Sequence, residues 1–453
     1  MTAEDIATWP IEALAPRLRD GELSAATLVE AVLERIAGYD GDLKAYRELS
    51  SGAVQAARAA DREIAQGRYR GPLHGIPVAL KDNFLTADMP SCLGVDLPPQ
   101  TFPRRDAVAV RRLREAGAII IGKTQMHGFA WGIVTPPTRN PWDRDRVPGG
   151  SSGGSAAAVV AGLCGAALGS DTGGSVRIPA SLCGCVGFKP TYGLIDKDGI
   201  VTHSWSLDVV GPLARTVGDA ALMLEALAGP GYAAALGQPI DGLRIGVCRQ
   251  HFFDRNAPEV QNAVETAVAH LAGRCAALVE VELPHLPYGL GAILAIELAS
   301  CTAGQAGLLR RGMQKRMPED VRTLLELGAF VSGADYLRAE QVRRLLMEDF
   351  RTAFAVADVI ITPTTPVTAW PHGETNVPIG DGQESILSAA WRLTYPFNLA
   401  GLPAITLPCG FDSRGLPIGL QIAGKPHAEN TVLSLAHAYE EAHDWTHRRP
   451  DLA

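Results

Sequence analysis

The sequence predicts an α/β protein that folds as one domain. The chain has 453 residues, of which 47% are hydrophobic and 20% charged, as in ordinary soluble globular proteins. From Pro72 onward, apolar runs of strand length alternate with segments of helical periodicity. No internal repeat, low-complexity linker or shift in composition divides the chain. We therefore expect a single domain spanning residues 1–453.

The N-terminal region, residues 1–67, is expected to be helical in three pieces. Leu14 and Leu18 belong to one apolar stripe with helical spacing, and Leu28 and Val32 belong to a second. Ser24 stands just before the second stripe, where a serine hydroxyl can cap the free N–H groups of a helix. A third stripe runs from residue 49 to residue 64. The whole region is predicted to contain helices and no strand.

Strands and helices alternate through the remainder of the chain. Predicted strands lie at residues 76–80, 118–122, 241–253, 278–283 and 356–366. Predicted helices lie at residues 107–116, 156–163, 258–273 and 336–354. The stretch 371–384, which contains glycine and acidic residues, is expected to be a surface loop. Residues 68–230 then form the core, 286–354 a mostly helical region, and 391–430 a return to the core.

Composition argues against several classes of protein. With 41 basic and 49 acidic residues the net charge is −8, whereas a nucleic-acid binder would carry a basic patch. The acidic N-terminus lacks the basic and apolar regions of a signal peptide, and no charge-free apolar run reaches the length of a membrane span. The eight cysteines are scattered without CxxC pairs, which fits reduced thiols better than disulfides or a zinc site. We expect a cytoplasmic protein with no metal, membrane or nucleic-acid partner.

Two glycine- and serine-rich clusters, at residues 149–155 and 171–175, carry the chemistry of this sequence. An apolar run without charge, residues 156–168, lies between them, which a solvated linker would not contain. Glycine allows positive φ and close approach, so a serine among glycines can present its hydroxyl beside free backbone N–H groups. Acyl transfer requires this combination of a nucleophile and oxyanion donors.

Other catalytic motifs fit the sequence less well. A phosphate-binding loop needs a lysine after its last glycine, but Gly154 is followed by Ser155. The formal match of residues 149–153 to a nucleophile elbow follows no strand, and none of the seven lysines completes a Ser-x-x-Lys motif. Lys81 ends the apolar run 76–80. It either reaches the surface or is a buried amine whose lowered pKa suits a base.

Four segments resemble the amidase signature enzymes. They read GPLHGIPVALKDN, GKTQMHGFAWG, the block from PGGSSGGSAAA to KPTYG, and NLAGLPAITLPCG followed by GLPIGLQIAG. The resemblance covers nearly the whole chain. It implies a single amidase-signature domain with a mixed central β-sheet covered by helices on both faces. It also implies that no cofactor or metal takes part.

The resemblance assigns catalytic roles to individual residues. Ser175 corresponds to the nucleophile, Ser151, after a cis peptide bond, to the bridging serine, and Lys81 to the base. The oxyanion hole corresponds to the backbone N–H groups of four residues: Thr172, Gly173, Gly174 and Ser175. Asp171 and Arg177 resemble partners that hold this turn, with Arg177 in an internal ion pair.

The substrate is less clearly indicated. Gln125 and Gly128 depart from the commonest residues of the family in a loop that lies by the substrate. The predicted substrate-binding residues, for which structural packing is the alternative, are His127, Phe129, Trp131 and Gly150. The helical region 286–354 is expected to line the substrate funnel. Aromatic residues near these loops, with Trp205 and Tyr395 among them, favour an uncharged apolar or aromatic group.

The predicted function is therefore a serine amidohydrolase that cleaves C–N bonds of small uncharged amides or carbamates, such as an aryl amide, an arylacetamide or a urethane. We expect it to act as a monomer or homodimer. One alternative is the amidase subunit of a glutamine-dependent tRNA amidotransferase or of a biuret-type hydrolase complex. The GKTQMHGFAWG segment and a shorter C-terminal region argue against the amidotransferase. A second alternative, a non-catalytic binding protein on the same fold, is disfavoured by the intact Lys81, Ser151 and Ser175.

Overall fold

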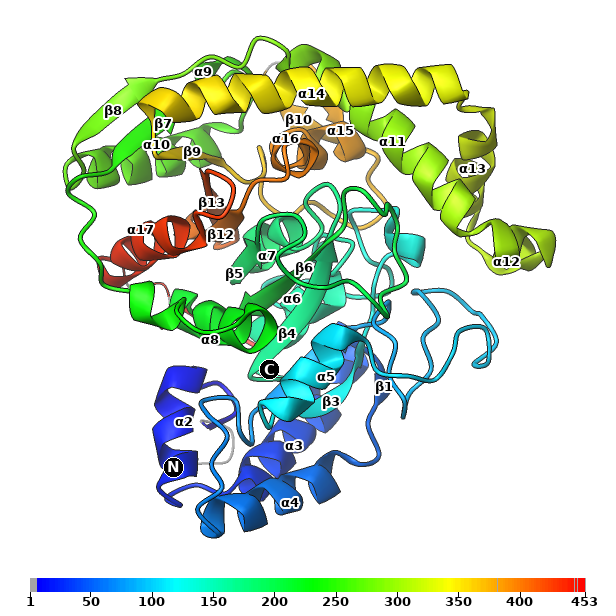
Figure 1. Ribbon diagram of the computed structural model, residues 1–453, viewed down its shortest axis with the longest axis vertical. Coiled ribbons are helices and arrows are strands. Elements are labelled where there is room, and N and C mark those ends of the chain that lie inside the picture. Colours follow the sequence, from blue (N-terminus) through cyan, green and yellow to red (C-terminus); the bar gives the residue numbers. More distant parts are fainter. Residues whose placement is uncertain (1–5, 381, 444, 446, 453) are drawn as a thin grey trace.

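An eleven-stranded mixed sheet runs through the molecule (Figure 1). The computed structural model describes residues 6–380, 382–443, 445 and 447–452. The strand order is β1-β3-β2-β4-β6-β5-β12-β13-β9-β7-β8. Their bounds are β1 Tyr46–Leu49, β2 Pro77–Lys81, β3 Ile119–Thr124, β4 Ala166–Asp171, β5 Val186–Lys189, β6 Val209–Ala214, β7 Arg244–Val247, β8 Ala277–Glu280, β9 Val359–Pro363, β12 Ala404–Phe411 and β13 Pro417–Gly424.

The sheet has a parallel section near each end and an antiparallel middle, and its edge strand β1 pairs antiparallel with β3. Strand β2 pairs in parallel with β3 and β4, and β7 pairs in parallel with β8 and β9. Between them β4, β6, β5, β12, β13 and β9 pair antiparallel in turn. The predicted α/β class and the mixed central sheet are both confirmed.

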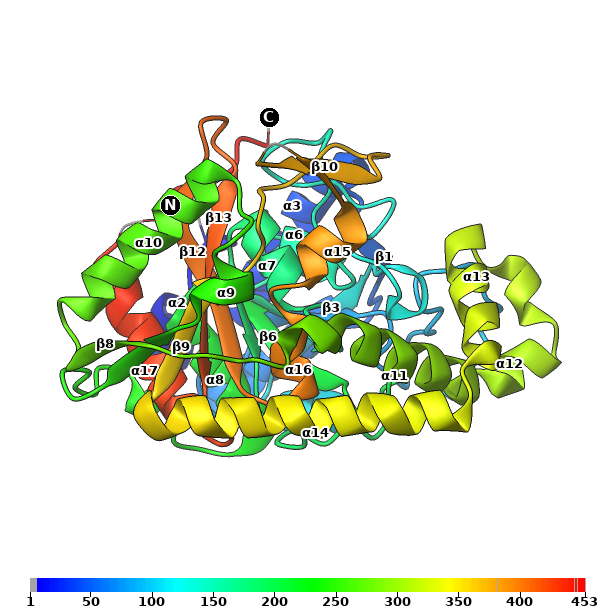
Figure 2. The same cartoon turned by 90° about the horizontal axis from the view of Figure 1, so that it is seen from above.

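Helices flank the sheet. They are α2 Ile11–Arg19, α3 Ala25–Leu43, α4 Ala53–Ala65, α5 Val108–Glu115, α6 Gly153–Val160, α7 Arg177–Cys183, α8 Val217–Ala228, α9 Arg249–Phe252, α10 Pro258–Ala272, α11 Gly289–Gly304, α12 Ala306–Arg310, α13 Glu319–Leu327, α14 Gly333–Val356, α15 Ile386–Trp391, α16 Tyr395–Leu399 and α17 Glu429–Glu441. Helices α12 and α13 project to one side of the molecule, beyond α11 (Figure 2). The chain thus carries a helical arm on one side of the molecule.

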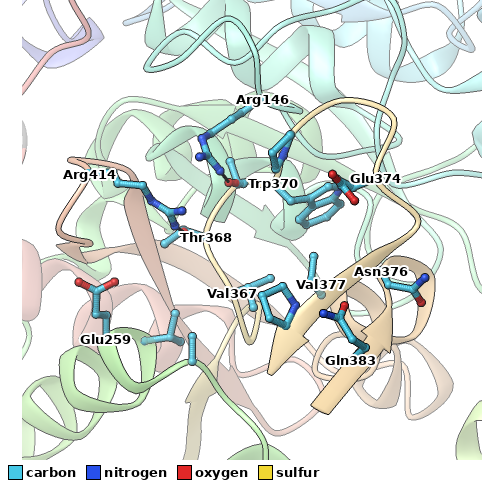
Figure 3. A pocket seen from close by; sticks show the side chains of 15 residues that line it. Arg146, Glu259, Val367, Thr368, Trp370, Glu374, Asn376, Val377, Gln383 and Arg414 are labelled. Carbon is cyan, nitrogen blue, oxygen red and sulfur yellow. Dashed lines mark hydrogen bonds between the residues drawn. The ribbon is translucent and has the colours of Figure 1, made fainter. Parts of the chain in front are cut away.

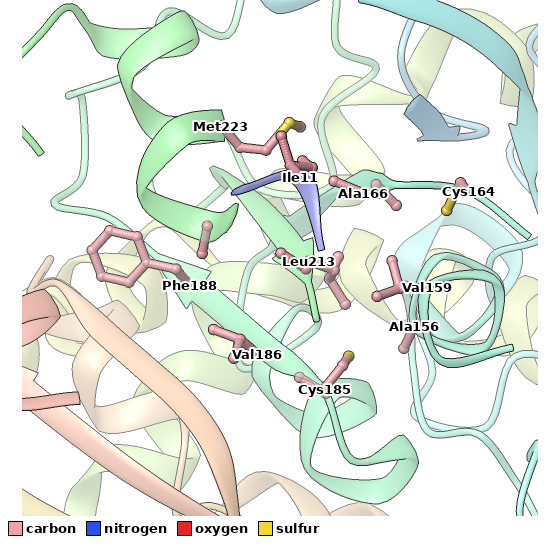
Figure 4. Packing of buried hydrophobic residues seen from close by; sticks show 14 of the residues in the cluster. Ile11, Ala156, Val159, Cys164, Ala166, Cys185, Val186, Phe188, Leu213 and Met223 are labelled. Atoms are coloured by element: carbon pink, nitrogen blue, oxygen red, sulfur yellow. The ribbon is translucent and has the colours of Figure 1, made fainter. Parts of the chain in front are cut away.

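The hydrophobic core lies along the sheet and joins segments far apart in sequence. Ile11 of α2 packs in the same cluster as Val186 and Phe188 of β5 and Met223 of α8 (Figure 4). Helix α6 enters this core through residues 156–158, three fully buried alanines. Small side chains let a helix approach a sheet closely, so α6 is held rigidly behind the loop at its N-terminus.

Several local predictions are confirmed at the level of single elements. Ser24 caps α3, since its hydroxyl accepts a hydrogen bond of 3.0 Å from the N–H of Thr27. Helix α10 at Pro258–Ala272 and helix α14 at Gly333–Val356 match predicted helices closely. Strand β2 at Pro77–Lys81 is shifted by one residue from its prediction. These elements have strong local signals.

Other local predictions are wrong. Residues 46–49, expected to be helical, form the edge strand β1, which pairs antiparallel with β3. The stretch 371–384, expected to be a surface loop, contains most of the hairpin of β10 Asn376–Ile379 and β11 Gly382–Ser385. The strand predicted at 241–253 is only Arg244–Val247 and is followed by α9. In the first two cases pairing with another strand overrode the local pattern. The first part of the predicted N-terminal helical region, residues 1–5, lies outside the described residues.

One helical segment has an unusually apolar composition. Within the described residues, the segment Leu286–Gly304, which includes α11, is long and apolar enough to cross a membrane by those two criteria alone. It contains the buried Glu297, and α11 packs against α14 and α16. Core helices of globular proteins have the same composition. We interpret α11 as such a core helix.

Candidate active site

Lys81 is the last residue of β2 and is fully buried. Its Nζ is 2.8 Å from Oγ of Ser151. It is also 2.9 Å from Oγ of Ser170 and 3.1 Å from the Ser170 carbonyl oxygen. Asn83 donates a hydrogen bond to the same Ser170 hydroxyl. The amine is therefore held by three oxygen atoms at one point.

Burial lowers the pKa of Lys81 to about 7, while the nearby carboxylates of Asp208 and Asp171 act in the opposite direction. A neutral amine has two N–H groups and one lone pair. The Ser170 carbonyl can only accept, so when Lys81 is neutral at least one of the two neighbouring hydroxyls must donate to Nζ. This geometry allows Lys81 to take a proton from Ser151.

Ser151 lies in the turn before α6, and its hydroxyl is inaccessible to solvent. The Gly150–Ser151 peptide bond is cis, as the sequence predicts. The Ser151 carbonyl oxygen accepts from the N–H of His127, and the N–H of Ser152 donates to the Ser175 carbonyl oxygen. The two glycine- and serine-rich clusters are thereby joined directly through their backbones.

The turn from β4 to α7 is organised by the carboxylate of Asp171. Asp171 accepts from the N–H groups of Gly174 and Val176, at 2.9 and 3.1 Å. Arg177 forms a fully buried two-point ion pair with it, at 3.0 and 3.1 Å. Burial alone would raise the pKa of Asp171, but Arg177 outweighs this and holds it at about 2. The predicted internal role of Arg177 is confirmed.

Two more elements fix the same turn from other sides. Asn398 of α16 donates to Asp171 at 2.8 Å and accepts from Arg177. Asp208, just before β6, accepts a hydrogen bond of 2.7 Å from the hydroxyl of Thr172. Because four separate segments converge here, the direction of each N–H group in the turn is determined by the folded molecule as a whole.

The glycines of this turn have no room for a side chain. A Cβ at Gly173 would collide with the indole of Trp391, and one at Gly174 would collide with the side chain of Thr394. Gly174 also has φ of +134°, a conformation that residues with a Cβ rarely adopt. The hydroxyl of Thr394 donates to the Gly173 carbonyl oxygen. The turn therefore closes against α15 and the residues that follow it.

Ser175 follows this turn and is the most accessible of the three predicted catalytic residues, with 8% of its surface exposed. It lines a narrow pocket together with Thr172 and Gly173. The rest of the lining comes from the loop 130–133, from Ile178, and from three further helices, α11, α13 and α15, through Leu294, Glu297, Leu324, Leu387 and Trp391. A hydroxyl, a backbone N–H turn and an apolar pocket thus meet at one place.

Comparisons with known proteins agree with this geometry. The amidase family profile matches residues 27–433. This chain belongs to the amidase signature family. Its relatives include a subunit of the glutamyl-tRNA(Gln) amidotransferase of Moorella thermoacetica, which is 42% identical over 97% of both chains. A solved amidase structure superposes with a TM-score of 0.89 at 35% identity over 96% of this chain and 99% of that one. The peptide amidase from Stenotrophomonas maltophilia superposes with a TM-score of 0.85 at 32% identity over 98% of each chain.

The four residues predicted to bind substrate in this amidase signature protein occupy different environments. Trp131 lines the pocket beside Ser175. His127 contacts Asp320 of α13, with 3.2 Å between Nε2 and Oδ2. Phe129 is buried in a cluster with Leu93 and other apolar residues. Gly150 is buried against the loop 132–135.

Two aromatic residues that the sequence analysis placed near the site lie elsewhere. Trp205 is 64% exposed, and Tyr395 is buried within the cluster around α11 and α14. Neither belongs to the lining of the pocket beside Ser175.

Sequence reasoning missed several residues of the pocket. Leu294 and Glu297 of α11, Leu324 of α13 and Trp391 of α15 reach it from regions more than a hundred residues from Ser175. Three of these positions, Leu294, Glu297 and Leu324, are consistent with the expectation that residues 286–354 line the substrate funnel. The sequence contained one signal for these residues, which is the glutamate at position 297 within the otherwise apolar stretch 289–304. Burying a carboxylate is costly unless it has a partner, so its presence in an apolar helix indicates a functional position.

A larger pocket of about 390 Å³ lies between the β10–β11 hairpin and the segment 367–371 (Figure 3). Its polar lining includes Arg146 and Arg414, each paired with a nearby aspartate. None of the predicted catalytic residues lines it. The chemistry of the family therefore points to the narrower pocket at Ser175.

Proposed function

We propose that this protein is a serine amidohydrolase that cleaves small uncharged amides or carbamates through an acyl-enzyme on Ser175. The observation that carries the proposal is the buried Lys81, whose Nζ is 2.8 Å from Ser151 and whose pKa is near 7. A largely neutral amine at physiological pH can serve as a general base.

The first chemical step forms the acyl-enzyme. Neutral Lys81 accepts the proton of Ser151, and Ser151 accepts the proton of Ser175 as the Ser175 oxygen bonds to the substrate carbonyl carbon. The C–N bond then breaks, and Ser151 returns a proton to the departing nitrogen while Lys81 gives its proton back to Ser151. Water repeats the sequence in the second step, releasing the acid and restoring the Ser175 hydroxyl.

The backbone of residues 172–175 supplies the oxyanion donors in this proposal. The N–H of Gly174 is already bonded to Asp171, which leaves the neighbouring N–H groups of the turn as the available donors. Preorganised donors of this kind are commonly worth about 3 kcal/mol each to the transition state. The buried Asp171–Arg177 pair keeps them in place without touching the substrate.

The lining of the pocket supports a small substrate without charge. Apart from Thr172, Ser175 and Glu297, its side chains are apolar or aromatic, and among the described lining residues there is no lysine or arginine. A substrate carboxylate would therefore lack a cationic partner there. An aryl amide, an arylacetamide and a urethane remain the candidate classes, and the narrowness of the pocket favours their smaller members.

The test is release of amine from a panel of an acyl anilide, an arylacetamide and an aryl carbamate by the wild type and by Ser175→Ala. We expect turnover with the wild type and none with the variant, while both give the same melting temperature. Turnover that persisted in Ser175→Ala would refute the proposal.

A second candidate function is the amidase subunit of a glutamine-dependent tRNA amidotransferase. The Moorella thermoacetica relative, which is part of such an enzyme, is 42% identical over 97% of both chains. The shorter C-terminal region expected from the sequence therefore does not separate this protein from that relative. In that role the tRNA could be bound by other subunits, and the net charge of −8 would not exclude a nucleic-acid partner. One observation argues against this candidate. Glutamine carries a carboxylate, and the described pocket residues include no basic side chain that could pair with it.

Glutaminase activity distinguishes the two candidates. An amidotransferase component should co-purify with partner subunits from its own cells and hydrolyse glutamine when they are present. Activity of the isolated chain on neutral amides, with no response to glutamine alone or with co-purified proteins, would leave the hydrolase as the function.

A further inference from the structure

Glu297 of α11 is the ionisable side chain in the lining of the pocket beside Ser175. Only 4% of its surface is exposed. Apart from a contact with His203, no hydrogen bond to its carboxylate is formed by the described residues. A buried carboxylate that forms few hydrogen bonds is costly, and it gains most from a partner that arrives with the ligand.

His203 is oriented toward Glu297 by its other ring nitrogen. Its Nδ1 is 2.9 Å from the carbonyl oxygen of Phe129, which can only accept, so Nδ1 carries a hydrogen. Its Nε2 then lies 3.5 Å from Oε2 of Glu297, too far for a short hydrogen bond. The ring of Trp131 meets the ring of His203 edge-on, with 4.3 Å between their centres. The imidazole is thus fixed between the predicted substrate loop and α11.

The charges of this pair offset each other. Burial alone would lower the pKa of His203, but its neighbours Cys301 and Glu297 outweigh that effect and raise it well above its usual value. Burial raises the pKa of Glu297 above its usual value, and His203 offsets only part of the rise. A protonated His203 balances the negative charge of Glu297. The pocket then offers carboxylate oxygens to the substrate, and the substrate does not need to carry a positive charge.

We propose that Glu297 selects substrates by accepting a hydrogen bond from an uncharged N–H group that is separate from the bond being cleaved. The substrate class is then a small amide that carries a second carboxamide or urea N–H. An ammonium group fits less well, because it would add a second positive charge beside His203 in a buried site. This inference rests on the proposed hydrolase function of Ser175 and specifies its substrate.

The experiment compares pairs of primary amides that differ only at the far end. Malonamide, succinamide and glutaramide are each paired with the methyl ketone that replaces the far NH₂ by CH₃: acetoacetamide, 4-oxopentanamide and 5-oxohexanamide. A buried hydrogen bond to a charged acceptor corresponds to about 10- to 100-fold in kcat/KM. We expect a ratio of at least about tenfold in favour of the diamide for the length that fits. We also expect the ω-ammonium analogue, 5-aminopentanamide, to be a poorer substrate than glutaramide and 5-oxohexanamide.

Variants of Glu297 test whether this residue causes the preference for the diamide over the methyl ketone. Glu297→Gln keeps a neutral acceptor and should reduce the ratio severalfold, and Glu297→Leu should bring it close to one. Glu429 provides a matched control, because it is also buried, at 2% exposure, but bonds the N–H of Thr191 away from the pocket. Glu429→Gln should leave the ratio unchanged.

Labelling of Ser175 by a fluorophosphonate separates the possible failures. Protection of Ser175 by each amide gives its binding constant even where turnover is slow or a variant is weakened. Ratios near one in the wild type, with Ser175 labelled, overturn the inference and leave the hydrolase standing. Failure of Ser175 to react, with no turnover of any amide, overturns the proposed function and the inference with it.

Discussion

At the scale of single residues, the candidate site depends on the protonation of one buried amine. Lys81 is surrounded by three oxygen atoms, and its burial makes the neutral form accessible near neutral pH. In the unfolded chain the same amine would titrate near 10.5. The fold therefore converts an ordinary lysine into a candidate base by removing water from it.

The first prediction concerns the pH dependence of activity. Because Lys81 must be neutral to accept a proton and its pKa is about 7, kcat/KM should fall about tenfold per pH unit below that value. The measurement is a pH–rate profile from pH 5.5 to 9 at constant ionic strength. A profile that stays flat down to pH 5.5 would contradict the assignment of Lys81 as base.

The second prediction concerns Lys81 and Ser151 acting as a unit. Lys81→Ala and Ser151→Ala should each lower kcat by about a thousandfold or more, and the double variant should be little worse than either one. Lys197→Ala, a lysine outside the site that contacts Tyr192, is the matched control and should keep normal activity. If the two losses multiplied in the double variant, the proposed relay would be wrong.

At the scale of elements, the turn between β4 and α7 is the part of the fold that positions the chemistry. It is held by Asp171 and Arg177 from within, and by α16 and the start of β6 from outside. Its glycines are packed against Trp391 and Thr394, so the turn tolerates no added side-chain atom. This turn orients backbone N–H groups toward the place where the oxyanion would form. That role depends on glycine at these positions and not on any particular side chain.

The third prediction tests that requirement with Gly174→Ala. The added Cβ would meet Thr394 in a backbone conformation with φ of +134°, so the turn must move. We expect kcat/KM to fall by about a hundredfold or more as oxyanion donors are misplaced. Gly193→Ala is the control, because Gly193 also has positive φ, at +84°, but has no atom within 4 Å of the added Cβ. That variant should lose stability through backbone strain and keep its activity.

At the scale of the whole molecule, the sheet buries several amines. Burial lowers the pKa of Lys81 and of Lys189 to about 7 and that of Lys123 to about 8. All three values lie below the 10.5 of the unfolded chain. Above these values the unfolded chain holds protons that the folded chain has lost, so the free energy of unfolding rises with pH.

The fourth prediction is that stability increases between about pH 7 and 9. Each buried lysine contributes up to about 1.4 kcal/mol per pH unit in that window. The effect is opposed by His203, whose raised pKa lets the folded chain keep a proton that the unfolded chain has lost, and at higher pH by thiols such as that of Cys164, whose pKa burial raises to about 12. Urea unfolding at pH 7, 8 and 9 measures the slope. Lys189→Met should make the slope smaller, and an unchanged slope in that variant would contradict the assignment.

Local sequence patterns determined a large part of this protein. The serine cap at Ser24, the helical stripe of α10 and the apolar run of β2 are confirmed, because capping, periodicity and strand propensity act over a few residues. The glycine clusters and their resemblance to a known family pointed to the region of the site, the mixed sheet and the cis peptide bond before Ser151. The cap, the helical stripe and the apolar run depend on residues that are close together in the chain.

Only the tertiary structure decided the features that depend on distant partners. Strand β1 exists because residues 46–49 pair with the edge of β3, and nothing in those four residues opposes a helix strongly. His127 lies against Asp320, and Glu297 lies against His203 beside Ser175, although α11 is more than a hundred residues away in the chain. The sequence alone determined which groups can carry out the chemistry. The packing of α11, α13 and α15 around the β4–α7 turn decided which side chains line the substrate pocket, because contacts between distant segments are set by how whole elements pack and leave no local pattern.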